Sequence, residues 1–314
     1  MKEIPQSELD AVIQSICAHP EYCDPEYVIS AYRSQGIEVI PDPFSAEIVA
    51  PIKQALRANQ GLSVERIGDG EINLLSYGAY ANTPNLDDNV VEVILGMQQD
   101  TFGVDRLWMI ILRDLMLGAV AQADIVGVIG LWRRRLVSVD QLIELFLNDY
   151  RGISGQWRAM DYMLRLAEQG ALDHKIVSSA HLYFSLLEHL DPILRLARTV
   201  FIISDRERML DKFKHRYPQV DFELIRVGKP VDSRQTPCDK PDFLGSVFSA
   251  LPADLQGSLC LIGAGPWAEI YCAWVKQRGG VGVDLGSGFD LLDGEMTRPI
   301  HDIVGWEQVR KYAL

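Results

Sequence analysis

The stretch Leu62-Ser63-Val64-Glu65-Arg66-Ile67-Gly68-Asp69-Gly70-Glu71 runs from an extended segment into a turn in which two glycines flank an acid. Residues 62–67 are predicted to form a strand, and Gly68 and Gly70 supply the turn. Open α/β sheets bind ligands at the carboxyl ends of their strands. We therefore expect a site at Asp69 and Glu71, with the rest of the chain as its frame.

Asp69 and Glu71 are candidate metal ligands because two carboxylates at positions i and i+2 can converge on one hard cation. Carboxylate and water ligands suit Mg²⁺ or Mn²⁺, and open positions remain for substrate phosphate oxygens. In the purely structural alternative, Asp69 caps a helix that starts near Glu71, and the glycines serve only the turn. Capping alone leaves Arg66 and Glu71 without a task.

Short apolar runs alternate with helical patterns along the rest of the chain. Further strands are predicted at residues 125–130, 175–179, 199–204, 222–227, 259–262 and 281–284. Helices are predicted at residues 45–59, 86–101, 105–122, 138–148, 155–168, 243–251 and 266–277. This alternation predicts an α/β fold with a mainly parallel, Rossmann-like sheet and helices on both faces.

The first 44 residues are predicted to be a small helical appendage to an α/β domain that spans residues 45–314. Residues 8–18 and 25–35 have helical spacing, and the sequence Pro41-Asp42-Pro43 marks a linker. Ser45 is the expected N-cap of the next helix. At the other end, the tail beyond Gly288 is expected to pack back as a short helix.

A second glycine-rich turn, Gly263-Ala264-Gly265-Pro266, follows the strand predicted at 259–262. The glycines allow a close backbone approach, and Pro266 fits the first turn of a helix whose N-terminal amides could receive a phosphate. Asp284 ends the next strand, about twenty residues further on, as in the dinucleotide-binding fingerprint.

Two further residues, Arg133 and Asp205, are candidates for the site. Arg133, in the run Arg133-Arg134-Arg135, could grip a diphosphate through its forked donors, although a solvated charge run is the alternative. Asp205 follows a strand, where it either caps a helix or serves as the general base for an acceptor hydroxyl. His181 is expected to be a capping or packing residue. The loop at 228–242 is either a lid or a surface excursion.

Both glycine-rich motifs resemble segments of a known enzyme family. Arg66-Ile67-Gly68-Asp69-Gly70-Glu71 resembles the Arg-aromatic-Gly-Asp-Gly-Glu signature of the bacterial GT-D type glycosyltransferases, and Gly265-Pro266-Trp267-Ala268 with Asp284-Leu285-Gly286 is similar to their late Gly-Pro-x-Ala and Asp-x-Gly segments. Ile67 stands where an aromatic residue is usual, and Ser287 where a His commonly follows. The resemblance implies that Asp69 and Glu71 face the metal and the sugar nucleotide.

Composition limits which classes of protein and of partner are compatible with the chain. With 314 residues, 48% hydrophobic and 23% charged, the chain has the make-up of a globular protein, and its net charge of −13 opposes a nucleic-acid partner. The five cysteines form no Cys-x-x-Cys pair, so reduced thiols in a cytoplasmic protein are expected. The start of the chain lacks the apolar core of a signal peptide. Charged residues interrupt the most apolar stretch, 107–132, which is expected to be a buried helix and strand.

The leading hypothesis is a metal-dependent glycosyltransferase that moves a sugar from a nucleoside diphosphate sugar, such as a UDP-sugar, to an acceptor hydroxyl of a glycan or glycopeptide, in surface glycan or glycoprotein synthesis. Arg66 would orient an acid or bind phosphate. The first alternative is a Rossmann-type enzyme that uses NAD or S-adenosylmethionine at the turn 263–266. The second is a noncatalytic nucleotide-binding module.

Overall fold

The computed structural model describes residues 3–96, 106–132, 138–227 and 243–314. Eight strands in these parts form one sheet with the order β1-β4-β3-β2-β8-β7-β5-β6, and every neighbouring pair is parallel. The strands are β1 (Glu38–Ile40), β2 (Leu62–Ile67), β3 (Ile125–Val128), β4 (Ile176–Ser179), β5 (Val200–Ser204), β6 (Phe222–Arg226), β7 (Leu259–Gly263) and β8 (Val281–Asp284). The predicted parallel α/β fold is confirmed.

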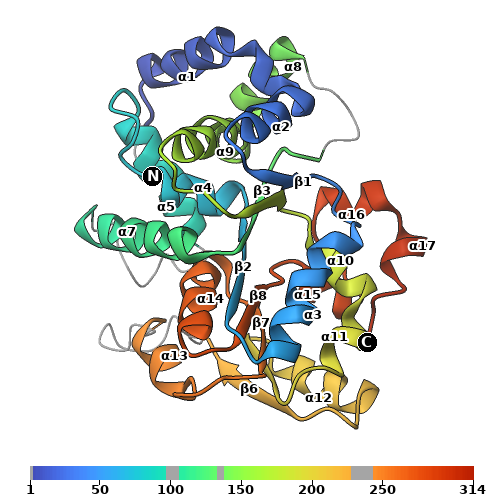
Figure 1. The fold of residues 1–314 in the computed structure, drawn as a ribbon. Coiled ribbons are helices and arrows are strands. Elements are labelled where there is room, and N and C mark those ends of the chain that lie inside the picture. Colours follow the sequence, from blue (N-terminus) through green and yellow to red (C-terminus); the bar gives the residue numbers. More distant parts are fainter. Residues whose placement is uncertain (1–2, 97–105, 133–137, 228–242) are drawn as a thin grey trace.

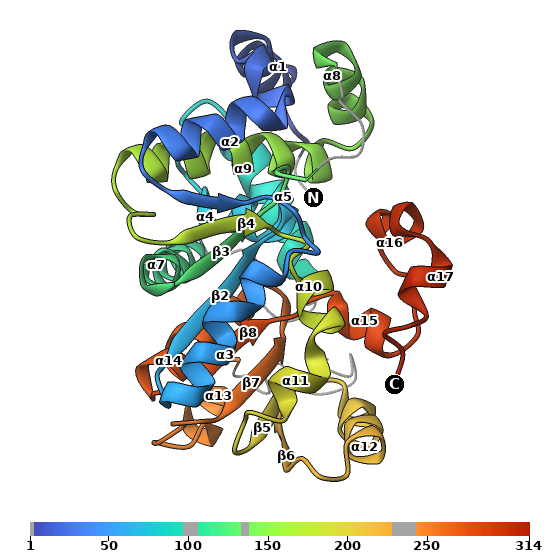
Figure 2. The same ribbon diagram turned by 45° about the vertical axis from the view of Figure 1, so that its right-hand side comes forward.

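Helices cover both faces of the sheet, as Figures 1 and 2 show. One layer consists of α1 (Gln6–Ala18), α2 (Pro25–Ser34), α4 (Asp69–Leu75), α5 (Pro84–Gly96), α7 (Arg106–Gln122), α8 (Val139–Asn148), α9 (Tyr150–Glu168), α13 (Gly245–Ala250) and α14 (Ala268–Gln277). The other layer consists of α3 (Val49–Ala58), α10 (Tyr183–Glu188), α11 (Leu190–Leu194), α12 (Glu207–Arg216), α15 (Gly288–Leu292), α16 (Pro299–Val304) and α17 (Trp306–Val309).

β5 shows how the sequence specifies this arrangement. Phe201 and Ile203 belong to the core under the first layer, whereas Val200 and Ile202 belong to the core under the second. Successive side chains of a strand point to opposite faces, so a strand buried on both faces must be apolar throughout. This is why the run at 199–204 is readily recognised in the sequence.

The N-terminal segment contains the two expected helices, α1 and α2, and also contributes a strand that the sequence pattern did not predict. Residues 38–40 pair with β4 at one edge of the sheet, with Val39 opposite Val177. From α1, the buried carboxylate of Glu8 accepts hydrogen bonds from the backbone N–H groups of Asn85 (2.9 Å) and Leu86 (2.8 Å) at the start of α5. The segment is thus joined to the body of the protein by strand pairing and by a helix cap.

Several predicted boundaries were wrong. α9 begins at Tyr150, five residues before the predicted start, although Gly152 and Gly155 are poor helix formers. Packing of α9 against α4 and α8 overrides that preference. β3 ends at Val128, before the turn at Gly130, where φ is +91°. The tail forms three short helices, α15 to α17, in place of one, and the end of the helix predicted at 86–101 lies outside the described residues.

The most apolar stretch of the sequence forms α7 and β3, as expected, but α7 is not buried all round. Leu107 is 65% exposed and Ile111 is 42% exposed, whereas Met109 and Leu112 are fully buried. Within the described parts of the chain, no helix has the length and the apolar character that a bilayer span requires.

The connections after β2 and β8 leave the sheet toward opposite layers. β2 leads into α4 in the first layer, and the neighbouring β8 leads into α15 in the second. In open α/β sheets, ligands bind outside the carboxyl ends of strands at such a divergence. The turn that carries Asp69 and Glu71 follows β2, and Asp284 ends β8, so the topology brings these segments together.

Candidate active site

The helix after β2 begins two residues earlier than the structural alternative requires. Gly68 is the N-cap of α4, and Asp69 is already the first helical residue, followed by Glu71 in the same turn. Asp69 is exposed, and its Oδ1 accepts a hydrogen bond from the N–H of Gly70 at 3.1 Å. The idea that Asp69 caps a helix starting near Glu71 is therefore wrong, because the helix begins at Asp69 itself.

Arg66, near the end of β2, contacts residues at the ends of β4 and β8. Its Nε donates a 2.6 Å hydrogen bond to the carbonyl of Ala180, just after β4, and its guanidinium carbon lies 4.9 Å from the ring centroid of Tyr183. Its Nη1 lies 3.6 Å from Asp284 Oδ2 at the end of β8. Arg66 thus holds Asp284 close to the turn that carries Asp69 and Glu71.

The Asp-x-Gly segment after β8 is shaped around the same guanidinium. A Cβ at Gly286, where φ is +44°, would collide with Arg66 Nη1. Asp284 is 4% exposed, and its Oδ1 has no hydrogen-bond partner among the described residues. Burial raises the pKa of Asp284 to about 6, against the opposing effects of Arg66 and of the Gly286 N–H.

Two further acids surround this pair. Glu71 is half-buried, and burial raises its pKa to about 7, with a smaller contribution from the charges of Asp69 and Asp284. Glu269, in the first turn of α14, is fully buried, and neither of its carboxylate oxygens has a hydrogen-bond partner in the described part of the chain. Burial, with the charges of Glu71 and Asp284, raises the pKa of Glu269 well above its usual value.

Glu269 was not predicted from the sequence. An acid in the first turn of a helix is ordinary, because it complements the helix dipole. Only the tertiary structure shows that Glu269 sits in the same buried group as Glu71 and Asp284. An anionic phosphate at the start of α14 would further oppose ionisation of Glu269.

The glycine-rich turn after β7 lies beside β8, as the fingerprint predicts. A Cβ at Gly263 would lie 2.5 Å from the ring of Phe289, so this glycine permits packing against α15. Gly265 has φ of +55°, and a Cβ placed there would meet no described atom within 4 Å, so its backbone faces open space. Pro266 is buried in the single 3₁₀ turn that precedes α14. Gly265 is therefore the position of this turn at which a ligand could approach the backbone.

One predicted residue, Asp205, is not brought into this group. Asp205 is exposed at the end of β5, where its Oδ1 accepts a weak 3.4 Å hydrogen bond from Ser204. β5 is three strands away from β2, or about 14 Å at the usual strand spacing. Arg133 and the loop at 228–242 lie outside the described residues.

His181 takes the packing role expected for it. Its ring lies edge-on to Trp132 and Tyr183, with centroids 6.3 Å and 6.0 Å away. Burial, with the nearby positive charge of Arg66, lowers the pKa of His181 to about 3. The imidazole is thus neutral at physiological pH.

In the described ranges, no group of three or more His, Cys, Asp or Glu side chains has the arrangement of a complete metal site. A cation held by Asp69 and Glu71 would therefore need water and substrate oxygens to complete its coordination. Asp284 pairs with Arg66, and Glu71 interacts electrostatically with Asp69, Asp284 and Glu269. This grouping of acids fits a hard cation.

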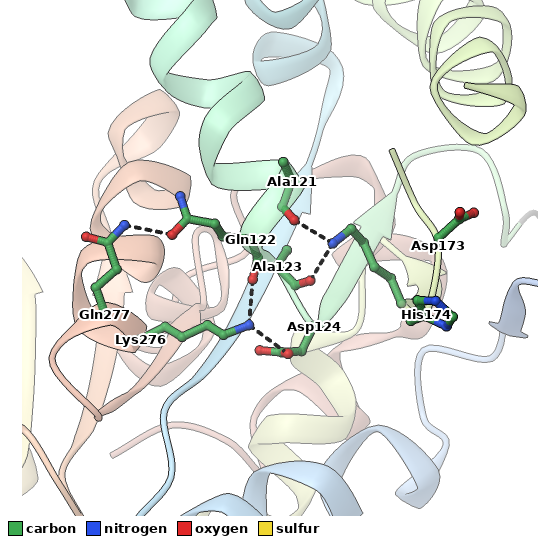
Figure 3. Close-up of a pocket in the computed structure, with 9 residues that line it drawn as sticks. Ala121, Gln122, Ala123, Asp124, Asp173, His174, Lys276 and Gln277 are labelled. Carbon is green, nitrogen blue, oxygen red and sulfur yellow. Dashed lines mark hydrogen bonds and ion pairs between the residues drawn. The ribbon is translucent and has the colours of Figure 1, made fainter. Parts of the chain in front are cut away.

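At the amino-terminal ends of the strands, a cavity of about 380 Å³ lies between the ends of α7 and α14 and the starts of β3 and β4 (Figure 3). Lys175 Nζ donates to the carbonyls of Ala121 and Ala123, and Lys276 Nζ donates to Asp124 and to the carbonyl of Gln122. Both lysines thus satisfy carbonyls at the end of α7. This cavity belongs to helix capping and lies away from the acidic corner.

Comparison with known proteins agrees with this geometry. No curated protein and no solved structure matches the chain. A family model described as a GT-D fold-like domain matches residues 44–292, which include every candidate site residue from Arg66 to Asp284. The match confirms the predicted family: the chain belongs to the GT-D fold-like domain family.

Proposed function

We propose that this protein is a metal-dependent glycosyltransferase that moves a sugar from a nucleoside diphosphate sugar, preferably a UDP-sugar, to a hydroxyl of a glycan or glycopeptide. The observation that carries the proposal is a cluster of acids in which Asp284 pairs with Arg66 and Glu71 interacts with Asp69, Asp284 and Glu269. The corner lies where the connections after β2 and β8 diverge, which is the ligand-binding edge of an open α/β sheet.

The charge of this corner is the reason for the proposed cation. A diphosphate carries negative charge, and ionising the acids beside it without a cation would place like charges together. A bound Mn²⁺ or Mg²⁺ would neutralise charge on the leaving diphosphate. Asp69 and Glu71 are the residues that would hold it, because they share the first turn of α4.

The other residues of the corner have separate roles in this proposal. Arg66 holds Asp284 and presents guanidinium N–H groups to the diphosphate. The backbone at Gly265 approaches the donor from the end of β7, because no described side chain fills the space beside it. Asp205 remains our proposed base for an acceptor that approaches across β5, since it is exposed on the same edge of the sheet.

One observation favours the Rossmann alternative. The unit β7-α14-β8 places Gly263, Gly265 and Asp284 as a dinucleotide fingerprint requires, with β7 and β8 as parallel neighbours. In that fingerprint the acid binds a ribose hydroxyl, but here Asp284 is buried and faces Arg66. The carboxyl group of Glu269 also occupies the first turn of α14, where the fingerprint places the pyrophosphate. We therefore place this alternative second.

Calorimetric titration with a panel of nucleotide sugars, NADH and S-adenosylmethionine, with and without a chelator, tests the proposal. We expect a nucleoside diphosphate sugar to bind only when Mn²⁺ or Mg²⁺ is present. Tight binding of NADH or S-adenosylmethionine without any response to nucleotide sugars would favour the Rossmann alternative. Metal-dependent binding without turnover across a panel of acceptors would favour the noncatalytic module.

A further inference from the structure

The C-terminal segment reaches the acidic corner from outside the region that the family model matches. That region ends at residue 292, and α16 and α17 follow it. These helices fold back on the second core, where Val309 is fully buried and Leu314 donates its N–H to the carbonyl of Leu292 at 2.9 Å. The segment therefore packs into the second core, behind α10 and α15.

The side chain of His301, in α16, points toward α10. It is fully buried, and its Nδ1 accepts a 3.2 Å hydrogen bond from the backbone N–H of Thr297. Since Nδ1 is the acceptor, the proton of the neutral ring belongs on Nε2. That N–H points to Tyr183 Oη, at 3.1 Å. His301 thus fixes the outer end of the Tyr183 side chain.

Tyr183 connects His301 to the site. The side chain is fully buried, and the turn at Gly288 packs closely against it, so that a Cβ added at Gly288 would lie 3.3 Å from Tyr183 Cβ. The guanidinium carbon of Arg66 lies 4.9 Å from the ring centroid of Tyr183. His301, Tyr183 and Arg66 therefore form one continuous chain of contacts from α16 to the end of β2.

The orientation of Arg66 depends on this chain. The hydrogen bond from Nε to Ala180 fixes one edge of the guanidinium, and the Tyr183 ring fixes its plane. A binding group whose rotamer is locked by its neighbours loses less entropy when the ligand arrives. A Tyr183 ring that lost its anchor at His301 would leave that plane less well fixed.

We propose that His301 and Tyr183 are positioning residues that hold Arg66 ready for the diphosphate of the donor. The segment after residue 292 is then a functional part of the site. This inference rests on the proposed function, because it assigns Arg66 to the donor.

The test uses UDP with Mn²⁺ as the probe and four variants of the full chain. Tyr183→Phe removes the hydrogen bond to His301 and keeps the ring, His301→Leu removes the imidazole, and His301→Gln keeps an amide donor. Tyr312→Phe is the matched control, because Tyr312 lies in the same segment and its hydroxyl bonds Glu188 and Gln308, away from Arg66.

Isothermal titration should show about tenfold weaker UDP binding for Tyr183→Phe and His301→Leu, because part of the free energy of UDP binding would then be used to fix Arg66. His301→Gln should restore most of the affinity. Tyr312→Phe should bind UDP as the parent does, even if its melting temperature falls as much as that of the other variants. Unchanged binding in Tyr183→Phe and His301→Leu would overturn the inference. An equal loss in Tyr312→Phe would do the same, since it would trace the loss to general destabilisation.

A second readout needs no ligand. Hydrogen exchange of the peptides at residues 66–72 and 180–186 should be faster in His301→Leu and unchanged in Tyr312→Phe. If the parent protein binds no nucleotide, the proposed function fails, and the exchange experiment still decides whether α16 is coupled to Arg66. Equal exchange in both variants would refute that coupling.

Discussion

Asp69 is the residue at which the functional and structural interpretations separate most clearly. Gly68 is the N-cap of α4, and among the described residues the Asp69 carboxylate accepts only from the neighbouring Gly70 N–H. An exposed carboxylate in the first turn of a helix contributes no more than about 1 kcal/mol to stability. Its charge is therefore available for a ligand at little cost to the fold.

We predict that Asp69→Asn and Glu71→Gln melt within a few degrees of the parent and lose metal-dependent sugar transfer. The loss should reach orders of magnitude, because a metal ion stabilises the leaving diphosphate by several kcal/mol in the transition state. Thermal melts and initial rates with Mn²⁺ provide the measurement. A fully active Asp69→Asn protein would remove Asp69 from the metal site.

The identities of Arg66, Asp69, Glu71 and Asp284 as candidates could be predicted from the sequence, because each stands at the end of a predicted strand. Glu269 could not, since an acid at a helix start has an ordinary explanation, and its lack of a partner among the described residues exists only in three dimensions. The contact of His301 with Tyr183 joins residues more than a hundred positions apart, and no local pattern encodes it.

At the scale of elements, strands that are apolar on both faces were predicted well, and β1 was missed. A three-residue strand at the edge of a sheet offers too short a pattern, and Pro41 directly after it indicates a linker instead. The early start of α9 was also missed, because its glycines oppose helix formation and only packing against α4 and α8 reverses that preference.

The turn between β7 and α14 gives a prediction at this scale. Gly265 has a positive φ and open space beside it, so any substitution strains the backbone by about 1–2 kcal/mol, whereas only a bulky one fills the space. We predict that Gly265→Val weakens donor binding more than Gly265→Ala, while the two variants melt alike. Titration with a nucleotide sugar and thermal melts test this.

Gly36 is the matched control for this turn, because it also has a positive φ, +76°, and a Cβ added there would meet no described atom within 4 Å. It follows α2, far from the acidic corner. Gly36→Val should lose stability to a similar extent and keep donor binding. If Gly265→Val binds the donor as well as Gly265→Ala does, the backbone at Gly265 does not approach the diphosphate.

At the scale of the whole molecule, the protein places acids in its interior as well as at the site. Glu65 lies in the central strand β2 and is fully buried, with one oxygen bonded to Ser63 Oγ and the other without a partner in the described ranges. Burial raises the pKa of Glu65 to about 8. Glu65, Glu71 and Asp284 therefore all bind a proton more tightly in the folded state than in the unfolded state.

These shifts predict that the folded protein becomes less stable as pH rises. A folded pKa above the unfolded value means that the folded state binds more protons between the two values, so stability is present at low pH and is lost as pH approaches the folded pKa. For Glu65 this interval runs from about 4.5 to about 8. His181, with its lowered pKa, has the opposite effect only below its ordinary value of 6.5.

We therefore expect the melting temperature of the metal-free protein to fall by a few degrees between pH 6.5 and 8, since one such group changes the stability by about 1 kcal/mol per pH unit. Glu65→Gln keeps an acceptor for Ser63 and removes the charge, so it should melt higher at pH 8 and show a flatter pH dependence. Glu223→Gln, at an exposed position of β6, is the control and should keep the parental slope. A parent protein whose melting temperature is constant over this range, or a Glu65→Gln variant with the parental slope, would show that Glu65 carries its charge in the folded state without penalty.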